Sequence, residues 1–304
     1  MKIIGILTSG GDSPGMNAAI NGILKTAFIN KIKVFGIYNG FKGLYKNNIK
    51  EIIKNKKINL INIGGTFLRS SRFKEFENKN IRIKAIDNLK KKKIDSLIII
   101  GGNGSYIGSK YLIKEGFSCI CLPGTIDNDV ICTDYSIGYF TALETIVEAI
   151  DRIRDTACSH KSIFIIEIMG RYCGNLTIAS AIAGKCEFFI IPEINFNIKN
   201  LIYEIKLKLL KGINNIIIAI TENIYNIKKL SKYIRKKIKF EVKTVVLGYI
   251  QRGGKPISYD RILGFRMGSY SIKLLIKGYN NICIGIKNNK IIFKNIIKEI
   301  NKIT

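Results

Sequence analysis

The 304-residue chain carries 50 Lys and Arg residues against 22 Asp and Glu residues, giving a formal net charge of +28, and 47% of its residues are hydrophobic. This length and apolar content suit two lobes with a large core and exclude a disordered chain. The excess lysine is scattered without a basic arm, so we expect no specific nucleic-acid binding, only a positive field that attracts anionic substrates. No apolar run approaches a membrane span and no signal peptide is evident, so we expect a cytoplasmic protein.

The cysteines are spaced in a way that does not suggest a metal site. The chain has seven cysteines without a C-x-x-C pair, and its one histidine is His160. Cys119 and Cys121 share one face of a predicted strand, where buried thiols behave as small apolar residues. We therefore interpret the cysteines as reduced structural thiols rather than zinc ligands.

Strands and helices alternate along the chain. Apolar runs predict strands at 2–7, 33–37, 97–100, 118–122, 163–168, 188–191, 215–220 and 244–247, with a small β-like pair at 282–293. Helices are expected near 16–29, 81–93, 106–115, 141–156, 198–211, 227–239 and 259–276. This order predicts an α/β fold of parallel sheets with helices on both faces.

Three of the predicted strands end in glycine-rich or acidic loops, at Gly10–Asp12, Gly101–Gly104 and Gly124–Asp129. The carboxyl ends of parallel strands meet at one edge of a sheet, so these loops should converge on one crevice. The first loop leads into a helix, a layout that brings backbone N–H groups against phosphate, although it is neither a Walker A loop nor a G-x-G-x-x-G turn. The loop at 64–72 offers two arginines to an anion, unless it is simply a solvated surface loop.

The third loop concentrates acidic and amide side chains directly after a buried strand. Thr125, Asp127, Asn128 and Asp129 fall within five residues. One carboxylate could accept a proton from an attacking hydroxyl while the other helps to hold a hard cation. The alternative is an Asp/Asn-rich turn with only a local role.

Five motifs occur in a characteristic order, at Thr8–Asp12, Gly64–Leu68, Pro123–Asp129, Met169–Gly174 and Gln251–Gly254. With these motifs the chain resembles the bacterial ATP-dependent 6-phosphofructokinase family over essentially its whole length. The resemblance implies two α/β lobes of three-layer architecture, with ATP bound by 1–138 plus 251–304 and sugar phosphate bound by 139–250. It also implies a homotetramer that uses Mg²⁺ and transfers the γ-phosphoryl group of ATP to the 1-hydroxyl of fructose 6-phosphate.

The resemblance assigns roles by motif. Asp127 would take the hydroxyl proton, Thr125 would order the substrate, and Arg171 would stabilise charge on the transferring group. ATP would contact Gly11, Arg72, Phe73, Gly102, Asn103, Gly104 and Ser105. The sugar phosphate would contact Thr125, Asp127, Asp129, Met169, Gly170, Arg171, Glu222, Lys243, Tyr249, Arg252 and Ser162. Magnesium would lie at Asn103 and Asp129, and an effector would contact Lys25, Lys54, Arg154, Glu187 and Lys211.

Some positions depart from the family pattern. Asn103 stands where the family has a magnesium-holding Asp, and an amide coordinates Mg²⁺ more weakly. Ser162 and Lys243 replace two arginines that reach the sugar 6-phosphate from a neighbouring subunit, and Tyr249 replaces a histidine. These changes leave open a catalytically impaired member with a binding or regulatory role.

A pyrophosphate-dependent relative is the remaining alternative. In that branch a lysine typically replaces the glycine of Pro-Gly-Thr, and an aspartate follows Gly-Gly-Asp. Gly124 and Gly104 occupy the corresponding positions here and favour ATP.

Overall fold

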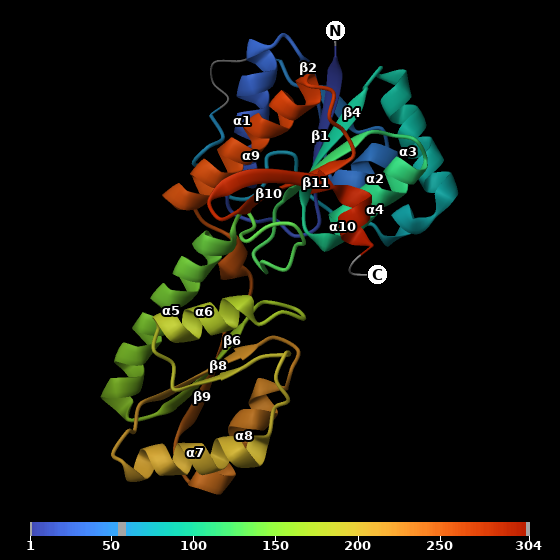
Figure 1. The fold of residues 1–304 in the computed structure, drawn as a ribbon. Helices are drawn as coiled ribbons and strands as arrows, with labels where there is room; N and C mark the ends of the chain where they lie inside the picture. Colours follow the sequence, from blue (N-terminus) through green and yellow to red (C-terminus); the bar gives the residue numbers. More distant parts are fainter. Residues whose placement is uncertain (1, 54–58, 302–304) are drawn as a thin grey trace. The chain divides into compact units, whose positions relative to one another are not determined.

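The computed structural model describes residues 2–53 and 59–301. The chain forms two compact units, Met1–Thr141 with Arg252–Thr304, and Ala142–Gln251 (Figure 1). The expected divisions at 138/139 and 250/251 therefore fall within three residues of the unit boundaries. Both units are built on mainly parallel sheets covered by helices, so the predicted α/β fold class is confirmed.

The first unit contains a seven-stranded sheet in the order β11-β10-β5-β4-β1-β2-β3. Its strands are β1 (Ile3–Ser9), β2 (Lys33–Ile37), β3 (Ile49–Glu51), β4 (Ser96–Gly101), β5 (Cys119–Pro123), β10 (Ile282–Lys287) and β11 (Lys290–Asn295). The central pairs are parallel, whereas β3 and β11 are antiparallel edge strands. The C-terminal strand β10 pairs with β5, so the last segment of the chain completes the sheet begun by the first.

Helices cover both faces of this sheet, because its central strands are apolar on both sides. The helices are α1 (Met16–Ile29), α2 (Gly40–Tyr45), α3 (Lys79–Lys91), α4 (Asn103–Lys114), α9 (Ser258–Ile276) and α10 (Ile296–Ile300), with the 3-10 helix η1 (Lys74–Glu77). Ile4 and Ile6 belong to the core layer under α1 and α9. Leu7 and Ile99 belong to the opposite layer, under α2, α3, α4 and α10. The unit is therefore a three-layer α/β/α structure.

Helices α1 and α9 approach each other through glycines. A Cβ atom at Gly22 would lie 2.3 Å from the carbonyl oxygen of Phe265, and a Cβ at Gly268 would lie 2.2 Å from that of Ala19. Both distances are far below van der Waals contact, so only glycine allows the two backbones to pack this closely.

The second unit contains a four-stranded, fully parallel sheet in the order β7-β8-β6-β9. Its strands are β6 (Ile163–Ile168), β7 (Phe188–Ile190), β8 (Ile216–Thr221) and β9 (Val242–Val246). Helices α5 (Tyr139–His160, starting in the first unit) and α6 (Asn175–Ala183) lie on one face, and α7 (Ile198–Leu210) and α8 (Ile227–Ile238) on the other (Figure 1). The 3-10 helix η2 (Gly248–Arg252) follows β9.

Six short elements have no counterpart among those predicted from the sequence: α2, β3, η1, α6, η2 and α10. Helix α5 also extends four residues beyond its predicted end at 156. No helix within 2–53 and 59–301 combines the length and apolar character needed to cross a bilayer.

Candidate active site

The strand order of the first unit reverses at β1, which has β2 on one side and β4 on the other. Ligands of open α/β sheets bind at such a switch point, outside the carboxyl ends of the strands. Ser9 is in register with Gly101, and Gly101 is in register with Pro123. The loops that follow β1, β4 and β5 therefore lie next to one another, as the sequence predicted.

The loop at 64–72 is held against the end of β1. Thr66 Oγ1 donates to Thr8 Oγ1 at 2.8 Å, Thr8 Oγ1 donates to the Arg69 carbonyl at 2.7 Å, and Ser70 Oγ donates to the Gly10 carbonyl. Arg72, at the end of this loop, is exposed to solvent, and Phe73 packs beside Tyr45. The predicted phosphate-contacting arginine thus extends from a loop bound to the Gly10–Asp12 turn.

Asn17 on α1 fixes the other end of this loop and was not identified from the sequence. Its Nδ2 donates to the carbonyls of Ile63 and Gly64 at 3.0 and 3.1 Å, and its Oδ1 accepts from Phe67 N–H at 2.6 Å. The only available signal was an asparagine in the first turn of a helix after a glycine-rich loop. Its partners are more than 40 residues away, so spacing could not identify them.

Two residues of the Gln251–Gly254 motif lie against the turn at Gly11 and the loop that starts at Gly64. A Cβ at Gly11 would lie 3.3 Å from Cζ of Arg252, and a Cβ at Gly64 would lie 2.2 Å from the Gly254 carbonyl oxygen. Arg252 was expected at the sugar phosphate, and its guanidinium lies beside the turn expected to hold ATP phosphates. A cation at this place suits a phosphate of either ligand.

Helix α4 begins at the second glycine-rich turn. Its N-cap residue, Gly102, has no side chain with which to cap the helix, so the first N–H groups suit an anion. Ser105 Oγ donates to the Ser9 carbonyl at 3.1 Å, which joins this helix start to β1. A Cβ at Gly102 would lie 3.5 Å from Cβ of Thr125, and the exposed Gly104 has nothing within 4 Å of its Cβ position.

The acidic loop after β5 is held by its own polar groups. Thr125 Oγ1 accepts from Asp127 N–H at 3.3 Å. Asn128, at φ 52°, accepts from Ser136 N–H at 2.8 Å through Oδ1 and donates to the Asp134 carbonyl at 3.0 Å. The polar contacts of a local turn are therefore present, and they leave Asp127 half-buried and Asp129 exposed beyond the carboxyl end of β5.

Asn103 contacts the second carboxylate of this loop. Its Nδ2 donates to Oδ2 and to the backbone carbonyl of Asp129, at 3.0 and 3.2 Å. Asn103 Oδ1 is buried and has no hydrogen-bond partner among the residues that the structure describes. Within the same residues, no group of three His, Cys, Asp or Glu side chains could hold a metal ion. With nucleotide phosphates as further ligands, the Asp129 carboxylate and the Asn103 amide fit Mg²⁺ when the amide turns over, so that Oδ1 in place of Nδ2 faces Asp129.

In the second unit, Glu222 organises the loop after β6. Its Oε1 accepts from the N–H groups of Gly170 and Arg171 at 3.3 and 3.1 Å, and its own N–H donates to the Ile168 carbonyl at 2.8 Å. Met169 N–H donates to Oε1 of Gln251 at 3.1 Å. Arg171 is exposed at φ 55°, so Met169, Gly170, Arg171 and Glu222 lie together.

Glu167 lies on β6 and was not identified from the sequence, and the charge of Glu222 influences its pKa. Burial, with a smaller contribution from the Glu222 charge, raises the pKa of the Glu167 carboxyl above its usual value. Glu167 is therefore a second acidic group near the carboxylate that accepts from the N–H groups of Gly170 and Arg171.

The three substituted positions differ in exposure. Ser162 is fully buried and its Oγ has no partner among the described residues, which argues against the expected contact with a substrate phosphate. Lys243 Nζ lies 3.7 Å from Glu241 Oε1 and 5.7 Å from the centre of the Phe164 ring. Tyr249 is 79% exposed.

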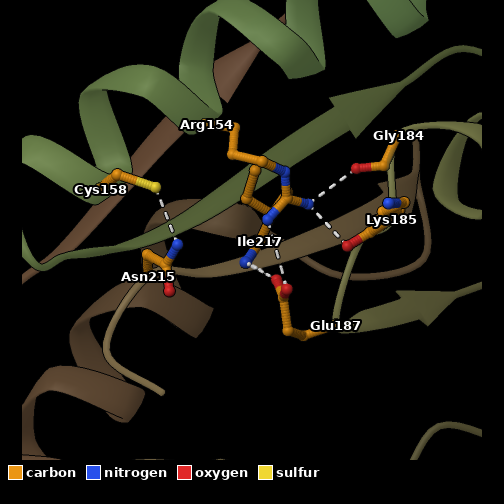
Figure 2. Close-up of polar contacts among 7 residues, drawn as sticks. All are labelled: Arg154, Cys158, Gly184, Lys185, Glu187, Asn215 and Ile217. Atoms are coloured by element: carbon orange, nitrogen blue, oxygen red, sulfur yellow. Dashed lines mark hydrogen bonds and ion pairs between the residues drawn. The ribbon is translucent and has the colours of Figure 1, made fainter. Parts of the chain in front are cut away.

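The predicted effector residues Arg154 and Glu187 bind each other (Figure 2). Arg154 Nη1 lies 3.3 Å from Glu187 Oε1, and Nη2 donates to the Gly184 and Lys185 carbonyls at 2.7 and 2.6 Å. Glu187 Oε2 accepts from Ile217 N–H at 2.7 Å. These contacts give both side chains a structural role within the second unit.

The remaining effector positions are spread over the chain. Lys211 is exposed after α7. Lys25 belongs to the first unit, where its Nζ lies 5.7 Å from the Phe265 ring centre, and Lys54 lies outside the described residues.

Comparisons with known proteins agree with this geometry. The family model "Phosphofructokinase" matches residues 3–275. The ATP-dependent 6-phosphofructokinases of Serratia proteamaculans and of Buchnera aphidicola from Schizaphis graminum are each 55% identical, over 99% and 97% of this chain and 94% and 92% of their own. Pichia pastoris phosphofructokinase in the T-state superposes with a TM-score of 0.93 at 30% identity, over 99% of this chain and 35% of that one. These matches confirm the resemblance drawn from the five motifs, and the chain belongs to the phosphofructokinase family.

Proposed function

We propose that this protein is an ATP-dependent 6-phosphofructokinase of glycolysis, which transfers the γ-phosphoryl group of ATP to the 1-hydroxyl of fructose 6-phosphate. The observation that carries the proposal is the Thr125–Asp129 loop, which lies beside two glycine-rich turns at the switch point of the sheet. Full-length relatives named for this reaction support the choice of donor and acceptor.

The first unit would bind the nucleotide and activate the acceptor. The turn at Gly11, the start of α4 at Gly102–Ser105, and Arg72 with Phe73 would receive ATP. Asp127 would accept the proton of the 1-hydroxyl as the bond to phosphorus forms, with the Thr125 hydroxyl holding the loop. Asn103 and Asp129 would hold Mg²⁺, which when bound neutralises phosphate charge.

The second unit would bind and orient the sugar phosphate. Met169, Gly170 and Glu222 would position it, and Arg171 would offset charge on the transferring group. Lys243, Tyr249 and Arg252 would contact the same ligand. We further propose a cytoplasmic homotetramer without a specific nucleic-acid partner.

The surroundings of Gly124 favour ATP over pyrophosphate as donor. A Cβ at this position would lie 3.0 Å from Ile100 Cγ2 and 3.0 Å from Met16 Cε, inside the buried core. The lysine typical of the pyrophosphate-dependent branch would therefore not fit without rearrangement.

A coupled assay with ATP, with pyrophosphate or without donor, over a range of Mg²⁺ concentrations, tests the proposal. We expect turnover with ATP alone, and at least a ~10²-fold loss in Asp127→Ser because the general base is removed. The matched control is Asp151→Ser, which removes an exposed carboxylate from α5 and should leave the rate unchanged. Turnover only with pyrophosphate would reverse the donor assignment, and no turnover with either donor would indicate an impaired, binding member.

A further inference from the structure

The segment after the acidic loop carries a cysteine that nearly touches a cysteine of the sheet. The Sγ atoms of Cys132 and Cys283 lie 2.6 Å apart. A disulfide bond is about 2.05 Å long, so a shift of about half an ångström would join the two sulfurs. Cys132 is partly exposed, whereas Cys283 on β10 is fully buried.

The backbone, rather than side-chain rotation alone, brings the thiols together. Asp134 N–H donates to the Ile286 carbonyl at 2.8 Å, and Ile286 N–H donates to Thr133 Oγ1 at 3.1 Å. A Cβ at Gly285 would lie 2.1 Å from the Cys132 carbonyl oxygen, so only glycine admits the segment this close to β10. Cys132 itself has φ 65°, a conformation that a non-glycine residue adopts at some cost. Residues 132–134 are therefore held against β10 by contacts that involve neither sulfur atom.

We propose that Cys132 and Cys283 are a redox-active pair that closes to a disulfide in the presence of a peroxide and reopens with a dithiol reductant. Peroxide oxidises the accessible Cys132 to a sulfenic acid and is reduced to water. Cys283 sulfur then attacks the Cys132 sulfur, the S–O bond breaks, and water leaves with the Cys283 proton. Two thiols and one hydrogen peroxide thus give one disulfide and two waters.

Two properties of the pair determine the rate at which the disulfide forms and the stability that it adds to the protein. The hydrogen bond to Cys283 and burial raise the pKa of the Cys132 thiol, so little thiolate is present near neutral pH and closure is slow. The two cysteines are 151 residues apart in the sequence, so the closed bond removes much of the freedom of the unfolded chain. We expect a raised melting temperature, by about 5 °C or more.

The test treats the full-length protein with hydrogen peroxide and then maps its peptides by mass spectrometry after digestion with trypsin and endoproteinase Asp-N. We expect the fragment 129–133 to be linked to the fragment 278–287, with the loss of two hydrogen atoms and full reversal by dithiothreitol. The melting temperature should rise on oxidation and return on reduction.

Two variants serve as controls. Cys132→Ser removes the accessible thiol while keeping the buried one, and should show neither the link nor the rise. Cys158→Ser removes an exposed cysteine of the second unit and should behave as wild type. Irreversible oxidation of Cys132 without the link would overturn the proposal, and so would a Cys283 link to Cys121, its neighbour on β5.

Discussion

Replacing Asn103 by aspartate should make the stability of the first unit depend on Mg²⁺. In the native protein the Asn103 amide donates to the Asp129 carboxylate and backbone carbonyl at 3.0 and 3.2 Å. An aspartate cannot donate either bond when ionised, and it places a second negative charge at the same distance. The substitution therefore turns an attractive contact into a repulsive one unless a cation lies between the two carboxylates.

The size of the effect follows from these distances. Two hydrogen bonds at a solvent-accessible site are worth about 0.5 kcal/mol each, at the low end of the usual range. Two unit charges about 3 Å apart repel by ~1.4 kcal/mol in water. The sum, about 2.5 kcal/mol, corresponds to a fall of roughly 5–10 °C in melting temperature for a unit of this size.

Melting curves in excess EDTA and in saturating Mg²⁺ measure this directly. Asn103→Asp should melt below wild type in EDTA and recover in Mg²⁺, and its activity should need less Mg²⁺ for half-maximal rate. Asn103→Ala loses the two hydrogen bonds without adding a charge. Its melting temperature in EDTA should therefore fall by less than half as much, and Mg²⁺ should not restore it. If Asn103→Asp melts at the same temperature with and without Mg²⁺, residues 103 and 129 do not share a metal.

Three further substitutions test contacts inside each unit, and urea denaturation measures the free energy of unfolding for each of them. Gly22→Ala should lower the free energy of unfolding by about 2 kcal/mol, because its Cβ would lie 2.3 Å from the Phe265 carbonyl oxygen. This loss exceeds the gain of about 1 kcal/mol that alanine offers over glycine inside a helix. A more stable variant would show that α1 and α9 can move apart. Burial raises the pKa of the Asp260 carboxyl, so the native protein keeps this proton to higher pH than the unfolded chain does. The stability of the wild type relative to Asp260→Asn should therefore fall as the pH rises above about 4, the usual pKa of an aspartate in an unfolded chain, and a rise would contradict this. Arg154→Ala should lower the free energy of unfolding by about 2–4 kcal/mol, because it leaves the partly buried Glu187 and two carbonyls without their guanidinium partner. A change below about 0.5 kcal/mol would indicate that Arg154 has little structural role and is available for a ligand.

The parallel strands were predictable because their apolar runs are continuous and short. Helix α6 was not, because its polar residues are inside. Thr177 Oγ1 bonds Thr221 Oγ1 at 2.8 Å and Ser180 Oγ donates to the Thr177 carbonyl, so both are buried. Its exposed face meanwhile carries Ile182, which is 70% exposed. The buried face thus mixes Thr177 and Ser180 with Leu176 and Ala181, and an isoleucine lies on the exposed face, so a hydrophobic pattern could not reveal the helix.

The acidic loop and the glycine-rich turns of the site were also predictable, because each follows a recognisable strand. The residues that hold them were not. Asn17 and Asp260 act through partners distant in the sequence, and the Asp260 carboxylate accepts from Gly138 and Thr141 near the start of α5. A single buried asparagine or aspartate on a helix gives no sequence signal until its partners are placed.

The pairing of β10 with β5 has a consequence for how the protein is made. During translation, the segment Ala142–Gln251 leaves the ribosome as one uninterrupted stretch and can assemble its own sheet while synthesis continues. Until α9 and β10 have been synthesised, the outer edge of β5 has no neighbouring strand and α1 lacks the helix that packs against it. A nascent chain stalled before codon 258 would therefore expose that edge, and chaperones should bind there until the final segment arrives.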